Sequence, residues 1–541
     1  MATPTESKLR GGYYTPDALA RFLAEWAIQP STRRILEPSA GDGTLVKAAA
    51  EALKAGTIHA IEFLDTEAEK IRALGIGGVE VITADALGWY SADFDGTYDA
   101  VIGNPPFIRY QSFQEPHRIA GFELMRTEGL NPTRLTNAWV PFVVLATRAL
   151  KVGGRLALVL PAELMQVGYA AELREYLAKS FTELNVITFE RLVFDNIQQE
   201  TVLLTGVRSG KKPAAASISF TELSDATNLD PTVLRTPERK RMDLDHSREK
   251  WVQFYLSNWE LGLLRELEGS PRFAPLGTLA RVNVGIVTGR NEFFVLRPSE
   301  AAALGVSEQC LPLVGRSAQI PGLELTMSDW RNLHSDDSKC LLLQLGRTPR
   351  AELSEAALRY VQSGEAKGFH DGYKLRIRMP EWWYVPSYTV PDAFMLRQIY
   401  DAPRIVLNKA AATSTDTVHR VWAKDGVDPR WLAAASMNSV TLAFSEVRGR
   451  SYGGGVLELE PSEAEGLPFP RPGSGLDLES LDREIREDGT EAVLSEVDRL
   501  VLTSAGLTAY EIDGVRRIWL TLSNRRKNRK GTSAPKDSMV A

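Results

Sequence analysis

The stretch Val101-Ile-Gly-Asn-Pro-Pro-Phe107-Ile108 joins an apolar strand to a loop that is poor in hydrogen-bond donors. Neither proline has a backbone N–H, whereas the loop carbonyls and the side-chain oxygen of Asn104 remain as acceptors. Two neighbouring acceptors suit a planar amino group with two N–H bonds. Phe107 offers a ring face on which the ring that carries this amino group could stack. From these residues alone, a plain turn capped by Asn104 explains the pattern equally well.

Length and composition predict a soluble globular protein of two to four domains. The chain has 541 residues, of which 44% are apolar and 24% charged. It contains no apolar run of about 18 residues, and residues 1–7 are polar, so we expect neither a membrane span nor a secretory signal. The only cysteines, Cys310 and Cys340, form no Cys/His cluster. This favours a cytoplasmic protein without a metal site, whereas the net charge of −6 decides nothing about nucleic acids.

Two motifs precede the apolar strand. Thr15 and Pro16 begin a predicted helix over residues 17–28, as an N-cap and a first helical residue; taken alone, they are better explained as a helix start than as a ligand site. Residues 37–43, Glu-Pro-Ser-Ala-Gly-Asp-Gly, form a glycine turn between a strand and a helix. The turn lacks the third glycine of a dinucleotide site, and its two carboxylates suit a cationic or amine-bearing ligand better than a phosphate.

Carboxylates also end the next two predicted strands. Glu62 ends the strand over residues 57–62, and Asp85 follows the strand that starts at Val79. A single acid at a strand end is more often solvated than functional. Three in succession, followed by residues 104–107, predict an open parallel sheet with a ligand over the carboxyl ends of its strands.

Three further strands are predicted at residues 155–161, 185–190 and 200–206. The connection over residues 191–199 is too short for a crossover helix, so the last two strands should be antiparallel. The predicted fold is α/β: a seven-stranded, mostly parallel Rossmann-like methyltransferase sheet with an antiparallel edge hairpin, plus a mixed α+β second domain.

The order of these motifs, from Tyr13-Tyr-Thr-Pro16 through the glycine turn to Asn104-Pro-Pro-Phe107, resembles that of a known family. Residues 13–208 resemble the amino-methylating DNA methyltransferases of the γ ordering, in which the amino-terminal ligand motif comes first. The resemblance covers about two-fifths of the chain and implies S-adenosylmethionine as cofactor.

The resemblance also implies roles for individual residues. The implied cofactor-binding residues lie at the strand ends and in the amino-terminal motif: Tyr14, Thr15, Pro16, Glu37, Pro38, Ser39, Ala40, Gly41, Asp42, Gly43, Glu62, Phe63, Asp85, Ala86 and Asn104. Among them, Glu62 is implied for the ribose hydroxyls and Asp85 for the adenine amine. The implied catalytic residues accept from the target amine or pack on the flipped base: Asn104, Pro105, Pro106, Phe107 and Phe194.

A second globular region follows a charged stretch at residues 235–250. Residues 373–378 alternate basic and apolar side chains, which predicts a strand with its basic side chains on one face. The candidate DNA-binding residues combine basic and aromatic side chains: Lys374, Arg376, Arg378, Trp382, Trp383 and Lys409. An ordinary amphipathic strand with two core tryptophans is the alternative. The region is more loosely similar to the target-recognition region of stand-alone adenine methyltransferases.

The predicted organisation has five parts. They are a catalytic domain (1–234), a charged connector (235–250), a target-recognition domain (251–470), a helical closing piece (471–523) and a basic tail (524–541). The ligand motif starts close to Met1, so we expect no amino-terminal nuclease.

The sequence therefore predicts a site-specific DNA methyltransferase that acts on adenine N6 of a flipped-out base in double-stranded DNA. We expect a monomer without metal that belongs to a restriction-modification or defence system, with any restriction enzyme on a separate chain. An RNA-adenine methyltransferase, a protein-glutamine methyltransferase and a non-catalytic DNA-binding module remain as alternatives.

Overall fold

The structure is a computed structural model of the full chain. It describes residues 14–191, 200–210, 217–226, 229–232, 240–241, 244–246, 248–386, 388–452, 455–473 and 475–528. The chain divides into two compact units. Unit 1 comprises Met1–Asn258, Tyr452–Gly454 and Asn528–Ala541, and unit 2 comprises Trp259–Ser451 and Gly455–Lys527.

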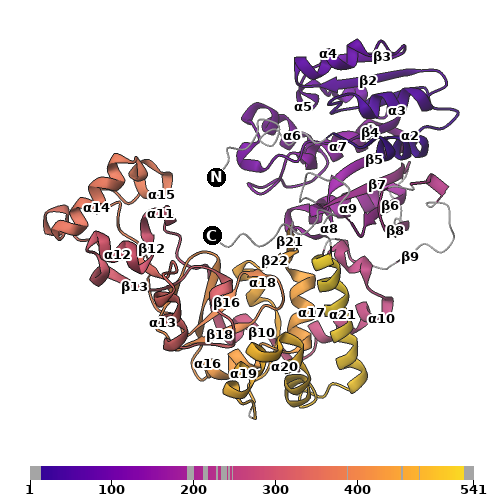
Figure 1. The fold of residues 1–541 in the computed structure, drawn as a ribbon. Coiled ribbons are helices and arrows are strands. Elements are labelled where there is room, and N and C mark those ends of the chain that lie inside the picture. Colours follow the sequence, from indigo (N-terminus) through magenta and orange to yellow (C-terminus); the bar gives the residue numbers. More distant parts are fainter. Residues whose placement is uncertain are drawn as a thin grey trace. The chain divides into compact units, whose positions relative to one another are not determined.

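Unit 1 alternates strands with helices through most of its length (Figure 1). Its strands are β1 (Arg34–Glu37), β2 (Thr57–Glu62), β3 (Val79–Thr83), β4 (Tyr98–Gly103), β5 (Leu150–Pro161), β6 (Phe181–Phe189), β7 (Thr201–Arg208), β8 (Ser217–Leu223) and β9 (Lys240–Arg241). Its helices are α2 (Asp17–Ala27), α3 (Thr44–Ala52), α4 (Asp65–Ala73), α5 (Ala86–Trp89), α6 (Glu115–Thr127), α7 (Trp139–Ala149), α8 (Glu163–Gln166) and α9 (Ala171–Ser180).

Within the described residues, these strands form one nine-stranded sheet in the order β3-β2-β1-β4-β5-β7-β6-β8-β9. The predicted count of seven is therefore wrong, because β8 and β9 extend the sheet beyond β6. The antiparallel pairing of β6 with β7 is confirmed. Their hairpin does not lie at an edge, however, because β7 is inserted between β5 and β6 and β8 covers the far side of β6.

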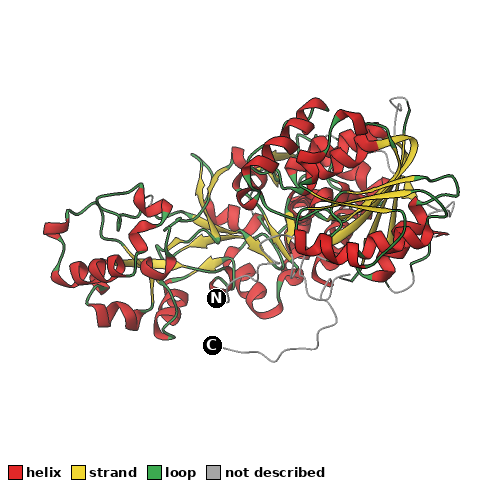
Figure 2. Ribbon diagram, turned by 90° about the horizontal axis from the view of Figure 1, so that it is seen from above, coloured by secondary structure: helices red, strands yellow, loops and turns green. Residues whose placement is uncertain are grey.

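The first five strands position the site. β1 to β5 pair in parallel, so their carboxyl ends lie along one edge of the sheet. Helices cover both faces of the sheet (Figure 2). On one face, α2 buries Leu19, Phe22 and Leu23 in a core shared with α3 and the central strands. This packing fixes the end of α2 that carries the amino-terminal motif.

Unit 2 is a mixed α+β structure. Its strands are β10 (Phe273–Pro275), β11 (Ala280–Asn283), β12 (Val295–Leu296), β13 (Cys310–Val314), β14 (Glu324–Leu325), β15 (Leu341–Leu343), β16 (Ala393–Leu396), β17 (Gln398–Ile399), β18 (Ile405–Asn408), β19 (Thr413–Ser414), β20 (Val418–Ala423), β21 (Arg450–Tyr452), β22 (Val456–Glu458) and β23 (Pro468–Pro470). The larger sheets have the orders β11-β20-β16-β18-β14 and β12-β15-β13-β19.

Helices surround these sheets in unit 2. They are α10 (Asn258–Glu268), α11 (Asn291–Phe294), α12 (Pro298–Leu304), α13 (Met327–Ser335), α14 (Glu355–Ala366), α15 (Tyr373–Arg376), α16 (Pro429–Ala435), α17 (Ser439–Arg448), α18 (Pro461–Glu465), α19 (Leu478–Asp488), α20 (Thr490–Val497) and α21 (Ala509–Asn528). α10 begins at Asn258, which ends the first segment of unit 1, and the other helices lie wholly or almost wholly in unit 2. The strand β21 ends at Tyr452, which belongs to unit 1.

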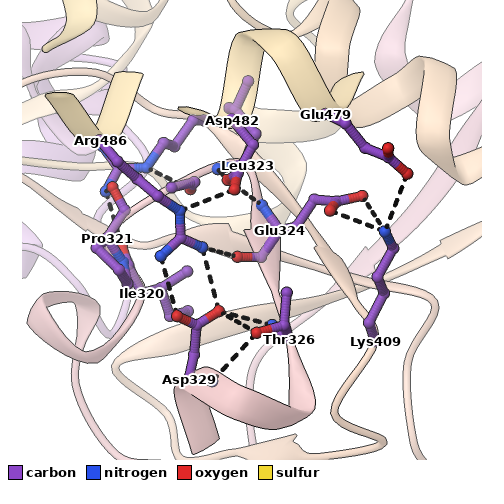
Figure 3. Close-up of polar contacts among 12 residues, drawn as sticks. Ile320, Pro321, Leu323, Glu324, Thr326, Asp329, Lys409, Glu479, Asp482 and Arg486 are labelled. Atoms are coloured by element: carbon purple, nitrogen blue, oxygen red, sulfur yellow. Dashed lines mark hydrogen bonds and ion pairs between the residues drawn. The ribbon is translucent and has the colours of Figure 1, made fainter. Parts of the chain in front are cut away.

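A polar cluster ties α19 to β14 and α13 in unit 2 (Figure 3). The Arg486 guanidinium donates to both carboxylate oxygens of Asp329, at 2.9 and 3.1 Å, and to the carbonyl of Glu324 at 2.7 Å. Asp482 accepts from the backbone N–H groups of Leu323 and Glu324, at 2.6 and 2.9 Å. Burial raises the pKa of Asp329, but its side-chain hydrogen bonds outweigh burial and hold the pKa below its ordinary value.

Replacing Arg486 by alanine should lower the free energy of unfolding of unit 2 by about 2 kcal/mol, because it leaves two half-buried carboxylates without their cation. Scanning calorimetry would measure this as a lower unfolding temperature. Arg483→Ala is the matched control, because Arg483 is exposed on the same helix and, among the described residues, its guanidinium makes one long bond, of 3.4 Å, to Ser480. Equal unfolding temperatures for the two variants would show that the cluster does not stabilise unit 2.

Candidate functional site

Residues 104–107 follow β4 at the edge formed by the carboxyl ends of the parallel strands. The Asn104 side-chain N–H donates to the hydroxyl of Thr15 at 3.2 Å, across 89 residues of sequence. Pro105 is buried, and Pro106 and Phe107 are half-buried. The structure thus brings the amino-terminal motif and the Asn-Pro-Pro-Phe loop together.

The end of β4 also packs closely against the end of β1. A Cβ atom placed on Gly103 would lie 3.3 Å from Glu37 Oε1 and 3.4 Å from Pro38 Cδ. Any larger residue would therefore push these groups apart. The absence of a side chain at Gly103 allows Glu37 and Asn104 to lie at adjacent strand ends.

The glycine turn connects β1 to α3. Gly41 and Gly43 have φ values of +56° and +86°, which residues with a side chain rarely adopt. The Gly41 N–H donates to Glu62 Oε2 at 2.8 Å, and a Cβ on Gly41 would lie 3.9 Å from the ring of Tyr14. The turn is therefore bordered by the carboxylate of β2 on one side and by the exposed Tyr14 ring on another.

Glu37 is the most deeply buried carboxyl group of the site, with an exposed fraction of 0%. Its Oε1 accepts from the backbone N–H of Ser39 at 3.0 Å and from the Ser39 hydroxyl at 3.3 Å. Within the described residues, Oε2 has no hydrogen-bond partner. Burial raises the pKa of Glu37 to about 8, although the Ser39 bonds oppose this. A buried carboxyl oxygen without a partner fits a ligand that brings an amine or a cation.

Glu62 differs from Glu37 because both its oxygens accept backbone N–H bonds. Oε2 accepts from Gly41 at 2.8 Å and Oε1 from Leu64 at 2.9 Å. Burial raises its pKa, and these bonds oppose the rise. Since each carboxylate oxygen can accept a second bond, the geometry suits a ligand with two neighbouring hydroxyls.

The remaining residues of the turn shape the backbone. The Ala40 N–H donates to the carbonyl of Ile61 at 2.9 Å, which holds the turn against β2. Asp42 accepts from the backbone N–H and the hydroxyl of Thr44, at 3.1 and 2.9 Å. Asp42 thus stabilises the entry to α3, in the manner of an Asx turn.

Asp85 follows β3 and caps α5, where its side chain accepts from the backbone N–H of Gly88 at 2.9 Å. Ala86, the next residue, is buried. His117 Nδ1 lies 2.8 Å from Asp85 Oδ2, and the His117 ring meets the edge of Phe63 with centroids 5.0 Å apart. Phe63 is 54% exposed, so its ring forms an open apolar surface beside the His117 ring.

Sequence reasoning missed His117. The residue belongs to α6, and it reaches Asp85 because α5 and α6 pack together. No motif or spacing in the sequence marks this contact.

A second group missed by sequence reasoning holds the loop that follows Phe107. Asn137 Oδ1 accepts from the backbone N–H of Tyr110 at 3.1 Å. Its amide nitrogen donates to Glu163 Oε2 at 3.0 Å and to the Tyr169 hydroxyl at 2.9 Å. Tyr169 in turn donates to Glu163 at 2.5 Å, and burial together with the Glu163 charge raises the pKa of Tyr169. Asn137 therefore joins the loop to a buried polar network.

Replacing Asn137 by alanine should lower kcat for the reaction proposed below by about tenfold, because the loop after Phe107 loses its side-chain anchor. The KM for the cofactor should not change, since Asn137 contacts none of the predicted cofactor residues in the bonds described above. Single-turnover and steady-state kinetics would measure both. Asn131→Ala is the control, because Asn131 pairs with Glu172 at the surface. A raised cofactor KM with unchanged kcat would contradict this role.

The strand predicted over residues 373–378 is wrong. Residues Tyr373–Arg376 form the short helix α15, and Lys374 and Arg376 are exposed on it. The apolar side chains of this stretch do not share one buried face, because Leu375 is buried whereas Tyr373 and Ile377 are exposed. Arg378 turns inwards and donates to the carbonyls of Thr288 at 2.7 Å and Tyr384 at 3.1 Å.

Three other predicted DNA-binding residues are held within unit 2. Trp382 and Trp383 are 1% and 2% exposed, in a core that includes Phe293, so of the alternative interpretation the two core tryptophans are confirmed and the amphipathic strand is not. Lys409 donates to Glu324 at 2.8 Å (Figure 3). The side chains of these three residues, like that of Arg378, therefore make contacts inside unit 2.

Phe194, the predicted opposing contact for the target base, lies outside the described residues. Among the residues that the structure describes, no group of three His, Cys, Asp or Glu side chains could hold a metal ion. A search of the same residues found no helix that is long and apolar enough to cross a membrane.

Two family models match this chain in consecutive segments. Residues 51–194 match the family described as "Eco57I restriction-modification methylase". Residues 248–502 match the one described as "Type II methyltransferase M.Eco57I, C-terminal domain". The first segment carries β2 to β6 with the Asn104 loop, and the second carries most of unit 2.

Individual relatives match over most of their length. Type II methyltransferase M.AccI from Acinetobacter calcoaceticus is 23% identical over 88% of this chain and 87% of its own length. Type II methyltransferase M.PaeR7I from Pseudomonas aeruginosa is also 23% identical, over 94% of each chain. A DrdV–DNA complex solved by electron cryomicroscopy is similar with a TM-score of 0.48 and 14% identity, covering 90% of this chain and 58% of that one. The chain is therefore homologous to type II methyltransferases of restriction-modification systems.

Proposed function

We propose that this homologue of type II restriction-modification methyltransferases transfers a methyl group from S-adenosylmethionine to the N6 amine of adenine in double-stranded DNA. The observation that carries the proposal is the meeting of three motifs at one sheet edge. Thr15 bonds to Asn104, Gly103 packs on Glu37, and Gly41 bonds to Glu62. In the γ-ordered methyltransferases that the sequence resembles, these motifs form the cofactor and target sites.

The buried acids fit the cofactor. Glu37 Oε2 lacks a partner among the described residues and suits the ammonium group of the methionine portion. The Glu62 carboxylate suits the ribose hydroxyls, and the Phe63 ring with Asp85 suits the adenine. When bound, S-adenosylmethionine supplies a methyl group on a positively charged sulfur.

Asn104 and Pro105 are the residues of this chain that we expect to accept hydrogen bonds from the target amine. Because the Asn104 amide nitrogen donates to Thr15, the orientation of the amide is fixed and its oxygen is the acceptor end. We expect this oxygen and the Pro105 carbonyl to accept both N–H bonds of the adenine amine. Accepting both hydrogens localises the nitrogen lone pair, which the ring otherwise shares. The nitrogen would then form its bond to the methyl carbon as the methyl–sulfur bond breaks, and the amine would lose one proton, without a nucleophilic residue in the protein.

The target adenine must leave the duplex stack before it can reach residues 104–107, at a cost of a few kcal/mol. Phe107 provides a half-buried ring on which the flipped base can stack. We further propose that the chain acts as a monomer without a metal ion and protects host DNA from a restriction enzyme encoded as a separate chain.

The test is a transfer assay with purified protein and methyl-labelled S-adenosylmethionine. Genomic DNA, total RNA and a cell protein extract are offered separately, and the labelled product is hydrolysed and identified. N6-methyladenine in DNA is the expected product. Label only in RNA, or only in glutamine of a protein, would replace the proposed substrate, and label in none would support a non-catalytic DNA-binding protein.

A further inference from the structure

The segment of residues 373–379 in unit 2 exposes three large apolar side chains within seven residues. Tyr373 is 71% exposed, Ile377 69% and Met379 54%. Lys374 and Arg376 lie between them and are also exposed. Single exposed apolar side chains are common on soluble proteins, but a group of this kind marks a contact surface.

The 373–379 segment is anchored to the structure beneath it. Leu375 is 1% exposed and packs into the core that includes Trp382. Arg378 donates to three backbone carbonyls, those of Val287 at 2.9 Å, Thr288 at 2.7 Å and Tyr384 at 3.1 Å. The exposed side chains are therefore presented on a fixed support, which lowers the entropy cost of binding a partner.

The charge around the segment is positive. Residues 367–380 contain three exposed cations, one inward-facing guanidinium and the carboxylate of Asp371, with Glu365 and Glu381 just outside this range, whereas the whole chain has a net charge of −6. The cations are Lys367, Lys374, Arg376 and Arg378. Arg290 adds a further guanidinium, which stacks on the Phe369 ring at 4.4 Å and lies 3.6 Å from Glu292. This local excess of cations on an acidic protein is complementary to a polyanion.

We propose that the 373–379 segment is a DNA contact in which charge and apolar surface act together; this rests on the function proposed above. Lys374 and Arg376 contact phosphates, while Tyr373, Ile377 and Met379 pack against sugars and base edges. Phosphate contacts position a protein on DNA, and apolar side chains against bases or between base steps add affinity that does not depend on salt. The cations that lie between the apolar groups match DNA better than they match a protein partner.

Two variants separate these contributions. The first replaces Tyr373, Ile377 and Met379 by serine, and the second replaces Lys374 and Arg376 by alanine. Fluorescence anisotropy measures the Kd at several salt concentrations, with a labelled duplex that the wild-type protein methylates. The serine variant should bind at least about tenfold more weakly with an unchanged salt dependence. The alanine variant should bind more weakly and lose about two units of the slope of log K against log salt concentration.

The controls alter similar side chains away from the segment. Val152→Ser removes a side chain that is 72% exposed near the amino end of β5, and Lys54→Ala removes an exposed cation at the end of α3. Both should bind DNA like the wild type, and all variants should bind S-adenosylmethionine and unfold like it. Because the altered residues are exposed, misfolding is not expected, and thermal unfolding checks this.

Three results would overturn the proposal. Wild-type DNA affinity in the serine variant, with methylation retained, would reject the apolar contact and leave the proposed function standing. Concentration-dependent association of the wild type that the serine variant abolishes, with DNA affinity unchanged, would make the segment a self-association surface. A wild-type protein that neither binds nor methylates duplex DNA would reject the proposed function itself, and with it this contact.

Discussion

Replacing Asn104 by alanine is expected to slow methyl transfer by about 100- to 1,000-fold, the range found when one oriented hydrogen-bonding group is removed from a catalytic site. The substitution removes the side-chain oxygen proposed to accept from the target amine. It also removes the bond to Thr15, which is 3.2 Å long in the structure. Single-turnover assays with methyl-labelled S-adenosylmethionine would measure the loss.

Two comparisons make this result specific to the amide of Asn104. Thr15→Val removes the same hydrogen bond but keeps Asn104, so its smaller effect isolates the contribution of amide orientation. Asn131→Ala removes a surface amide of unit 1 and should leave the rate unchanged. If Asn104→Ala retained more than about a tenth of the wild-type rate, an acceptor role for this side chain would be excluded.

Replacing Glu37 by glutamine is expected to weaken S-adenosylmethionine binding by about 10- to 100-fold, since a buried hydrogen bond to a charged group contributes about 1.5–3 kcal/mol. Burial raises the pKa of Glu37 to about 8, so the free protein carries it protonated at neutral pH. An incoming ammonium favours the ionised form, and binding therefore releases a proton. Calorimetric titration in two buffers of different ionisation enthalpy would measure that proton.

The pH dependence of binding follows from this release. Below pH 8 the wild-type affinity should rise by up to about tenfold per pH unit, and above it the affinity should fall as the ligand's own α-amino group, with a pKa near 8, loses its proton. The affinity of Glu37→Gln for S-adenosylmethionine should not rise with pH below pH 8. Glu51→Gln, which alters an exposed carboxylate on α3, should behave as the wild type does. A rising limb retained in Glu37→Gln would place the titrating group elsewhere.

The same pKa shift makes the stability of the free protein fall as the pH rises, whereas it makes cofactor binding strengthen. The folded chain holds the Glu37 proton more tightly than the unfolded chain does, because the pKa rises from 4.5 to about 8 on folding. Its contribution to stability is therefore complete below pH 4.5 and is lost as the pH rises towards 8. Glu37→Gln should not show this loss, and thermal unfolding between pH 5 and 8 would detect the difference.

Much of unit 1 could be predicted from the sequence, because parallel strands bring their carboxyl ends to one edge whatever packs around them. The positions of Glu37, Glu62 and Asp85 at strand ends follow from this rule and agree with the structure. The two additional strands could not be predicted. β8 and β9 are joined to the sheet by pairing with β6 and with each other, and their sequences carry no signal of that partner choice.

The polar contacts of His117 and Asn137 could not be predicted because they depend on how helices pack rather than on local sequence. The misassigned strand at residues 373–378 has a different cause. A four-residue helix such as α15 covers barely one turn and is too short to show a helical period in the sequence, so the alternating polarity of residues 373–378 also fits a short strand. Trp382 and Trp383 illustrate the same limit, since their burial depends on contacts with Phe293 and other residues distant in sequence.

The hydrogen bond between Thr15 and Asn104 has a thermodynamic consequence. It joins a residue proposed to lie beside the methyl donor to one proposed to grip the methyl acceptor. Any shift of Thr15 when the donor binds therefore changes the orientation of the Asn104 amide, and the reverse must hold to the same extent. The two ligands should accordingly change each other's affinity by one common factor, and Thr15→Val should bring that factor closer to unity.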